Sequence, residues 1–186
     1  VHPQIYVEPI NEIERGLIEG RFHIGVIPNH RPSSSLDYYP LFEEQMYLYC
    51  ATGHPLFGAA QKKITPAVVR NCKYVGIGYH SPNMEVGRKL GQHRDATAYD
   101  QEAVAHLVMS GRYIGYLPAH YVDSFSDPTA MQQLLPELFQ YLCQFSAIVR
   151  HSPPPNRVVQ TLLDTLKDTH SSQQHQSLPL SETAVL

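Results

Sequence analysis

The sequence predicts an α/β protein with parallel sheets. Short apolar segments bounded by turn residues alternate along the chain with segments whose apolar residues recur at helical spacing. Of the 186 residues, 42% are hydrophobic and 17% are charged, which is enough apolar material to form a core in one or two small units. Strands that alternate with helices at this pitch pack as α/β layers.

The predicted strands are apolar runs that end at glycine, proline or polar turn residues. Residues 22–27 form a compact run between Gly20 and Pro28, which is typical of a strand buried on both faces of a parallel sheet. Residues 141–150 are long, apolar and free of glycine and proline. The six predicted strands cover residues 5–7, 22–27, 41–52, 74–77, 113–117 and 141–150.

The predicted helices are defined by their caps and stop signals. Asp100 can cap a helix with one apolar face, and Gly111 ends it. Ser81 can cap another helix, because Pro82 takes the first helical position after it. The predicted helices are one over residues 10–18 before a glycine, a short one opening at 64–66, one over about 82–90, one between 100 and 111, and one carrying residues 158–166.

Charge and cysteine usage exclude several classes of protein. The net charge of −3 and the absence of any run of Lys and Arg argue against DNA binding by this chain alone. The three cysteines are an odd number without CxxC spacing, so neither a disulfide framework nor a cysteine zinc site is predicted, and a reducing cytoplasm fits. No apolar stretch approaches the roughly 18 residues of a membrane helix, so no membrane association is predicted.

Enzyme and cofactor motifs are absent from the sequence. It contains no Gly-x-Ser-x-Gly elbow, no HExxH, no phosphate-binding Gly-x-x-x-x-Gly-Lys loop and no Gly-x-Gly-x-x-Gly fingerprint. His120 and Asp123 have a spacing that metal ligands use, but a third partner is missing. We therefore predict no catalysis, no cofactor and no metal site.

Four segments, taken in order, resemble the effector-binding domain of LysR-type transcription regulators, whose fold is similar to that of type 2 periplasmic solute-binding proteins. The resemblance covers about residues 1–167 and is carried by spacing. His23 departs from the acidic residue usual in the first segment, and Tyr113 stands where a second glycine is common. The four segments are residues 17–26, residues 41–50 with Gly53-His54-Pro55-Leu56, residues 110–118, and residues 150–153.

The resemblance implies two Rossmann-like α/β subdomains that are joined by two crossing strands, with a ligand cleft between them. Mapped onto this sequence, the first subdomain would be residues 1–48 plus 106–170 and the second residues 49–105. Residues 171–186 are polar and rich in Gln and Ser, which predicts a disordered tail. The family also has a winged helix-turn-helix, a linker helix, and a first strand and helix of subdomain one. All of these would precede His2 and Pro3, so we expect the chain to be a fragment.

Two loops are candidate ligand sites, because open α/β sheets present ligand contacts where buried strands end. Pro28, Asn29 and His30 follow the strand at residues 22–27. Tyr79, His80 and Ser81 follow the strand at residues 74–77. The helix N-terminus near Ser81 would favour an anionic group. The alternatives are that Ser81 only caps its helix and that His30 and His80 are solvated loop histidines.

Three further residues are candidates for the site. Tyr116 and Leu117 resemble positions that line the family's cleft, with ordinary strand packing as the alternative. Tyr99 is a candidate for the cleft or for a hinge.

The predicted function is that of a sensor. A small molecule, anionic on the Ser81 argument, would bind the cleft, shift the two subdomains and change how a homodimer or homotetramer holds DNA through its winged helix-turn-helix. The alternative is an extracytoplasmic solute-binding protein of the same fold, which would require an export signal.

Overall fold

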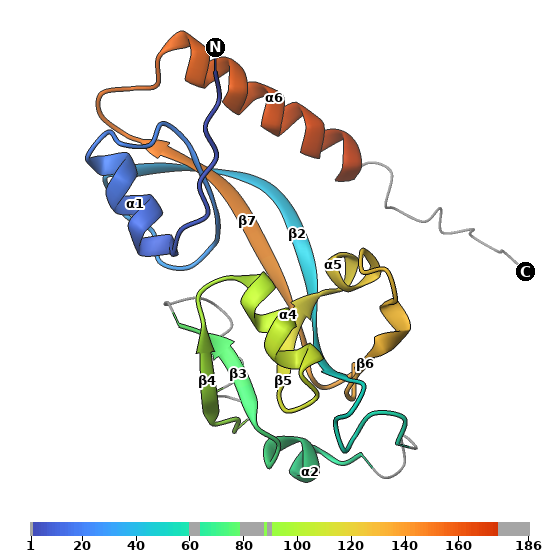
Figure 1. Cartoon of the computed structure of the whole chain (residues 1–186). Coiled ribbons are helices and arrows are strands. Elements are labelled where there is room, and N and C mark those ends of the chain that lie inside the picture. Colours follow the sequence, from blue (N-terminus) through green and yellow to red (C-terminus); the bar gives the residue numbers. More distant parts are fainter. Residues whose placement is uncertain (1, 60–63, 79–87, 89–90, 175–186) are drawn as a thin grey trace, which may run out of the picture.

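The computed structural model describes residues 2–59, 64–78, 88 and 91–174 (Figure 1). The elements alternate between strand and helix over much of the chain, as the sequence predicts. In chain order they are α1 (Ile10–Ile18), β1 (Gly25–Pro28), β2 (Leu36–Ala51), α2 (Pro66–Arg70), β3 (Tyr74–Ile77), β4 (Arg94–Ala98), α4 (Gln101–Met109), β5 (Ile114–Pro118), α5 (Ala119–Asp123), η2 (Pro128–Ala130), β6 (Met131–Gln133), β7 (Gln140–Arg150) and α6 (Arg157–Gln174).

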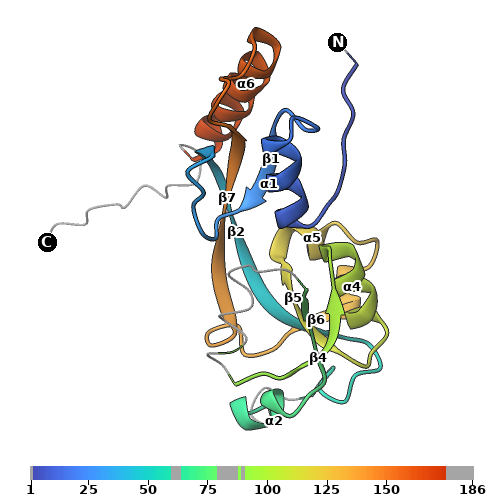
Figure 2. The same ribbon diagram turned by 90° about the vertical axis from the view of Figure 1, so that its left-hand side faces the viewer.

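Two long strands connect the two ends of the molecule. β2 and β7 pair antiparallel from Leu36 opposite Arg150 to Tyr47 opposite Gln140, with one irregularity between Pro40 and Phe42. Figures 1 and 2 both show these strands passing from one packed unit to the other. The sheet order is β1-β7-β2-β5-β3-β4, with β6 pairing with β2. We call the end that holds α1, β1 and α6 subdomain I, and the end that holds β3, β4, β5 and α4 subdomain II.

Subdomain I has a core on each face of its sheet. On one face Ile10 and Leu17 of α1 pack against Ile27 and Ile148. On the other face Leu163 of α6 packs in a cluster that includes Val149. The helix α6 continues to Gln174, so residues 171–174, which the composition assigns to the tail, are helical. Residues 175–186 lie outside the described part of the chain.

The structure corrects two strand predictions in subdomain I. The strand predicted at residues 22–27 is present as β1, but it begins at Gly25. β1 pairs antiparallel with β7 and has no second neighbour among the described strands, so it is an edge strand, and Val26 is 41% exposed. Residues 5–7 form no strand, and Ile5 is 91% exposed. An isolated extended segment has no neighbour to supply ladder hydrogen bonds, and Tyr6 instead packs on Phe22 with ring centroids 5.5 Å apart. In Figure 2 this segment runs apart from the strands.

Subdomain II contains the parallel part of the sheet. β3 lies between β4 and β5 and is parallel to both, and all four of its residues are buried, as the sequence predicts. The carboxylate of Asp100 accepts a hydrogen bond of 2.7 Å from the backbone of Ala103, which confirms the predicted cap of α4. Thr65 caps α2 through the N–H of Val68. β4 has no continuous apolar run, and the sequence prediction therefore missed it.

The packing differs from the predicted division of the chain. Two core clusters fill subdomain II, and together they include residues from Met46 to Cys143. Val108 of α4 and Leu117 of β5 pack there against Val75 of β3. The predicted boundary between residues 105 and 106 therefore falls inside α4. The family resemblance implies a boundary at that helix, but the apolar face of α4 packs entirely in subdomain II.

The turn after β2 depends on a buried, uncharged histidine. His54 is buried, and its Nδ1 accepts a hydrogen bond of 3.2 Å from the backbone of Leu56. Burial lowers the pKa of His54, because a protonated imidazole would lose water and would lose this acceptor.

We expect the melting temperature to fall as the pH is lowered through about 6.5, the pKa of an unfolded histidine. Above that value both states are neutral and the full stability is present. Below that value His54 is protonated readily in the unfolded state only, which favours unfolding. The free energy of unfolding therefore decreases as the pH falls from about 6.5 to the lower pKa that His54 has in the folded state. The variant His54→Asn keeps a side-chain acceptor for the turn without titrating. Thermal unfolding at several pH values should show a smaller acid loss in this variant, and an equal loss would contradict the assignment.

Candidate functional site

A cleft with two adjoining cavities lies where the two subdomains face each other. Their volumes are about 610 and 520 Å³, and Ile10 and Tyr99 line both. Both volumes fall within the range of about 300 to 1,000 Å³ that is usual for ligand pockets. Subdomain I contributes the start of α1 and the residues after β1. Subdomain II contributes the residues after β3 and β4 and the first turn of α4.

The larger cavity has the crossing strands as one wall. Phe145 of β7 is the register partner of Pro28, and both line the cavity together with Met46. Tyr99 and Tyr121 of subdomain II also line it. The cavity therefore combines apolar and aromatic surface from both subdomains, an arrangement typical of ligand pockets.

Carboxylates are prominent in the larger cavity. Burial raises the pKa of Glu44, and the charge of His120 partly offsets this, with 3.6 Å between Glu44 Oε1 and His120 Nε2. Burial also raises the pKa of the adjacent Cys143 thiol to about 12, and the Glu44 charge adds to the effect. Such a thiol is inert as a nucleophile at neutral pH. None of the described residues that line this cavity is Lys or Arg, and Glu8, Asp100 and Glu102 also line it.

The smaller cavity contains a polar network. The Nε2 of His30 lies 3.4 Å from Glu14 Oε1, and both side chains are largely buried. The hydroxyl of Tyr38 donates to the same Glu14 oxygen at 3.5 Å and accepts from the backbone of Ser33 at 3.1 Å. This network fixes the loop after β1, and the side chain of Arg31 is exposed beside it.

Asn29 anchors that loop to β7. Its Oδ1 accepts a hydrogen bond of 2.6 Å from the hydroxyl of Ser146, and its backbone N–H donates to Gln144 at 2.7 Å. Ser146 is buried, so this contact is shielded from water. Asn29 therefore orients its neighbours Pro28 and His30 toward the two cavities.

Three of the sequence-predicted site residues, Pro28, His30 and Tyr99, line the cleft. Tyr116 and Leu117 are 2% and 0% exposed, lie in core clusters and line neither cavity. Tyr79, His80, Ser81 and the helix predicted at residues 82–90, apart from residue 88, lie outside the described residues. Direct contact of any of these residues with a ligand stays a prediction.

Sequence reasoning did not select several residues that line the cleft. Glu14 and Glu44 belong to a helix and a strand, whereas the prediction considered only the loops that follow buried strands. The sequence pattern identifies Asp100 only as a helix cap, whereas the structure also places it in the lining of the larger cavity. One feature of the sequence could have identified Glu44. The alternation of residues along the strand places this carboxylate on the face where apolar, buried residues are expected.

Comparison with known families decides the classification. The family model described as the LysR substrate binding domain matches residues 1–171. The chain belongs to this family. The LysR substrate-binding domain described here is also 36% identical over 156 residues to the HTH-type transcriptional activator BauR of Pseudomonas aeruginosa. That match covers 84% of this chain and 51% of BauR, so the domain spans about half the length of this curated relative.

Solved structures show the same fold. The regulatory domain of CcmR from Synechocystis PCC6803, in complex with 2-PG, has a TM-score of 0.68 at 16% identity and covers 86% of this chain and 78% of its own. The regulatory domain of HypT from Salmonella typhimurium has a TM-score of 0.68 at 15% identity, with coverages of 88% and 80%. Full-length OxyR C199D from Pseudomonas aeruginosa has a TM-score of 0.65 at 19% identity, with coverages of 85% and 56%.

Among the described residues of this LysR substrate-binding domain, no group of three or more His, Cys, Asp or Glu side chains could hold a metal ion. None of the described helices has the length and apolar character that crossing a bilayer requires.

Proposed function

We propose that the chain senses a small-molecule effector for a LysR-type transcription regulator and that the effector binds in the cleft between the subdomains. The observation that carries the proposal is that Pro28 and His30 of subdomain I face the same cavities as Tyr99 of subdomain II. A ligand there touches both subdomains at once and can therefore change their relative position.

The effector carries an anionic group in this proposal, and the smaller cavity is the better place for it. Four carboxylates line the larger cavity and would repel an anion. Two carboxylates line the smaller cavity, and both already have partners: Glu14 lies beside His30, and Glu12 pairs with Arg15. The exposed Arg31 forms no salt bridge among the described residues. A guanidinium binds carboxylates and phosphates through two parallel hydrogen bonds.

In the whole protein, the ligand would act on DNA at a distance. We propose that a winged helix-turn-helix reads the operator, that the regulator works in the cytoplasm as a homodimer or homotetramer, and that it has no catalytic role. Movement of subdomain II relative to subdomain I would then change the spacing of the DNA-reading elements.

A thermal-shift screen of the chain against small carboxylic and phosphorylated acids tests the proposal. A ligand that binds only the folded state raises the melting temperature in proportion to the logarithm of its concentration. For any hit, Arg31→Gln and Tyr99→Ala should each weaken binding by about tenfold, the effect of one lost charged or aromatic contact. Arg112→Gln, an exposed arginine in the turn after α4, is the matched charge control. A hit that binds all three variants as tightly as the parent would contradict the proposed site.

A further inference from the structure

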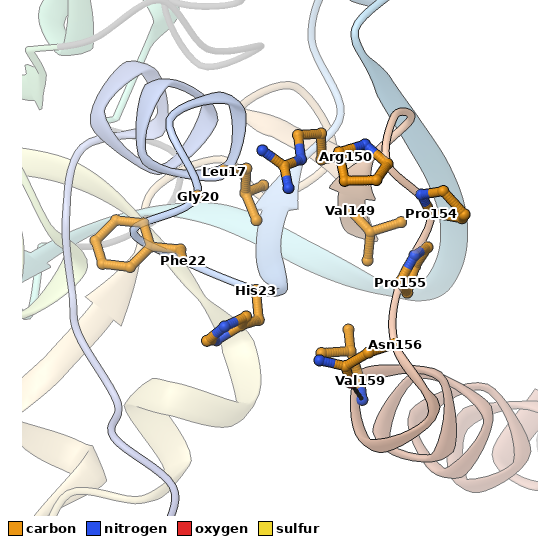
Figure 3. Close-up of a pocket in the computed structure, with 11 residues that line it drawn as sticks. Leu17, Gly20, Phe22, His23, Val149, Arg150, Pro154, Pro155, Asn156 and Val159 are labelled. Carbon is orange, nitrogen blue, oxygen red and sulfur yellow. Dashed lines mark hydrogen bonds between the residues drawn. The ribbon is translucent and has the colours of Figure 1, made fainter.

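A separate cavity of about 300 Å³ lies in subdomain I, at the opposite end of β1 from the cleft. Figure 3 shows that its residues come from α1, from the turn after α1, from the end of β7 and from the start of α6. Residues of this cavity do not line either cavity of the cleft. The volume is at the lower end of the range for ligand pockets, which is enough for a ligand about the size of one substituted ring.

The walls of this cavity are mainly apolar. Leu17, Val149 and Val159 are buried residues of the two cores of subdomain I, and their side chains reach the cavity. Phe22, His23 and three consecutive prolines also line it. An apolar body placed here would be removed from water on several sides, which is favourable at about 25 cal/mol per Å² of apolar surface buried.

One cation lies beside this apolar space. Nη1 of Arg150 donates a hydrogen bond of 3.4 Å to the carbonyl of Ile18. Arg150 forms no salt bridge with a carboxylate among the described residues, and no acidic residue lines the cavity. A guanidinium has five N–H donors, so one long contact with the end of α1 leaves most of them available.

The start of α6 adds to the positive potential. Asn156 lines the cavity, and its Oδ1 accepts hydrogen bonds of 3.0 Å from the N–H groups of Val158 and Val159. The N-terminal end of a helix is the positive end of its dipole, and α6 has 18 residues. An anionic group between Arg150 and this helix end would be attracted from both sides.

We propose that this cavity is a second ligand site, which takes a small monocarboxylate with an apolar body. The carboxylate lies at Arg150, and the body lies against Leu17, Val149 and Val159. The site is independent of the proposed effector cleft, since no residue is shared between them.

Benzoate is a suitable probe, and benzamide is its neutral counterpart of nearly the same shape. In an NMR titration of the ¹⁵N-labelled chain, benzoate should shift the amide signals of Leu17, Val149 and Val159. Benzamide should bind at least about tenfold more weakly, because it cannot form charge-assisted hydrogen bonds with the guanidinium. Signals that shift only around the cleft, at His30 and Tyr99, would overturn the proposal.

Variants of Arg150 complete the test. Arg150→Gln should weaken benzoate binding by at least about tenfold, and Arg150→Lys should recover part of it. Arg112→Gln removes the same charge from an exposed position in the turn after α4, in the other subdomain, and should leave binding unchanged. Equal binding of benzoate by Arg150→Gln and Arg112→Gln would overturn the site. If Arg150→Gln does not fold, the comparison of benzoate with benzamide in the parent chain decides.

Discussion

Replacement of Gly111 by valine is expected to lower the free energy of unfolding by about 3 kcal/mol or more, the combined scale of backbone strain and overpacking. Gly111 follows α4 with φ of +69°, a conformation that a β-branched residue adopts only with strain. A Cβ at this position would also lie 2.7 Å from the carbonyl oxygen of Thr52 and 3.0 Å from the carbonyl carbon of Gly53. Both neighbours are backbone atoms, so neither can rotate away. Urea unfolding monitored by circular dichroism would measure the loss.

Gly58 provides the control for that experiment. Its φ of +68° is almost the same, but a Cβ there would have no atom within 4 Å. Gly58→Ala and Gly111→Ala therefore share the backbone strain and differ only in the contact with the segment after β2. We expect Gly58→Ala to cost about 1 kcal/mol. If both alanine variants lower the free energy of unfolding by the same amount, the backbone near Gly111 moves away from the added Cβ without an energetic cost, which would contradict the expected steric effect.

Truncation of Leu163 to alanine is the second large effect, with an expected loss of about 2–5 kcal/mol. Leu163 is fully buried between α6 and the crossing strands, where Leu41, Ala147 and Val149 surround it. The substitution leaves a cavity in this small core, because few neighbouring side chains are available to move into the space. The loss is measured by urea unfolding of the variant and the parent under identical conditions.

The neighbouring residue distinguishes packing from helix propensity. Leu162 is 47% exposed on the same helix, and Leu162→Ala makes the same chemical change outside the core. Alanine favours a helix slightly more than leucine, so the expected change in stability is within about 0.5 kcal/mol. A loss for Leu162→Ala as large as that for Leu163→Ala would mean that α6 packs differently from the structure.

Local signals in the sequence were sufficient where one segment determines its own structure. The cap at Asp100, the stop at Gly111 and the buried strand at Tyr74–Ile77 all follow from a few adjacent residues, and the structure contains all three. Pairing partners required information from distant segments. β1 has the apolar composition of an interior strand, yet it lies at an edge and pairs with residues more than 100 positions later. No pattern within residues 22–27 encodes that neighbour.

The candidate site was predictable to a similar degree. The rule that ligands meet strand ends selected Pro28 and His30, which line the cleft. Tyr116 and Leu117 were selected by resemblance, and the structure places both side chains in cores. Successive side chains of a strand point to opposite faces of the sheet. Here Tyr116 and Leu117 point into the cores on the two faces of the sheet, so neither side chain reaches the cleft. The carboxylates of the cleft come from separate elements, and only the tertiary fold brings Glu14 and Glu44 to one place.

The paired strands β2 and β7 limit how the two subdomains can move. Their long antiparallel ladder resists sliding, because a shift of one residue would break the hydrogen bonds between them and turn each side chain to the opposite face. Bending and twisting cost far less, and the irregular register between Pro40 and Phe42 is the weakest place in the ladder. The strand pair therefore acts as a hinge that bends and twists but does not slide. A ligand that binds in the cleft as proposed would rotate one subdomain about the strand pair and would not slide it along the strands. Displacements would then grow with distance from the strands.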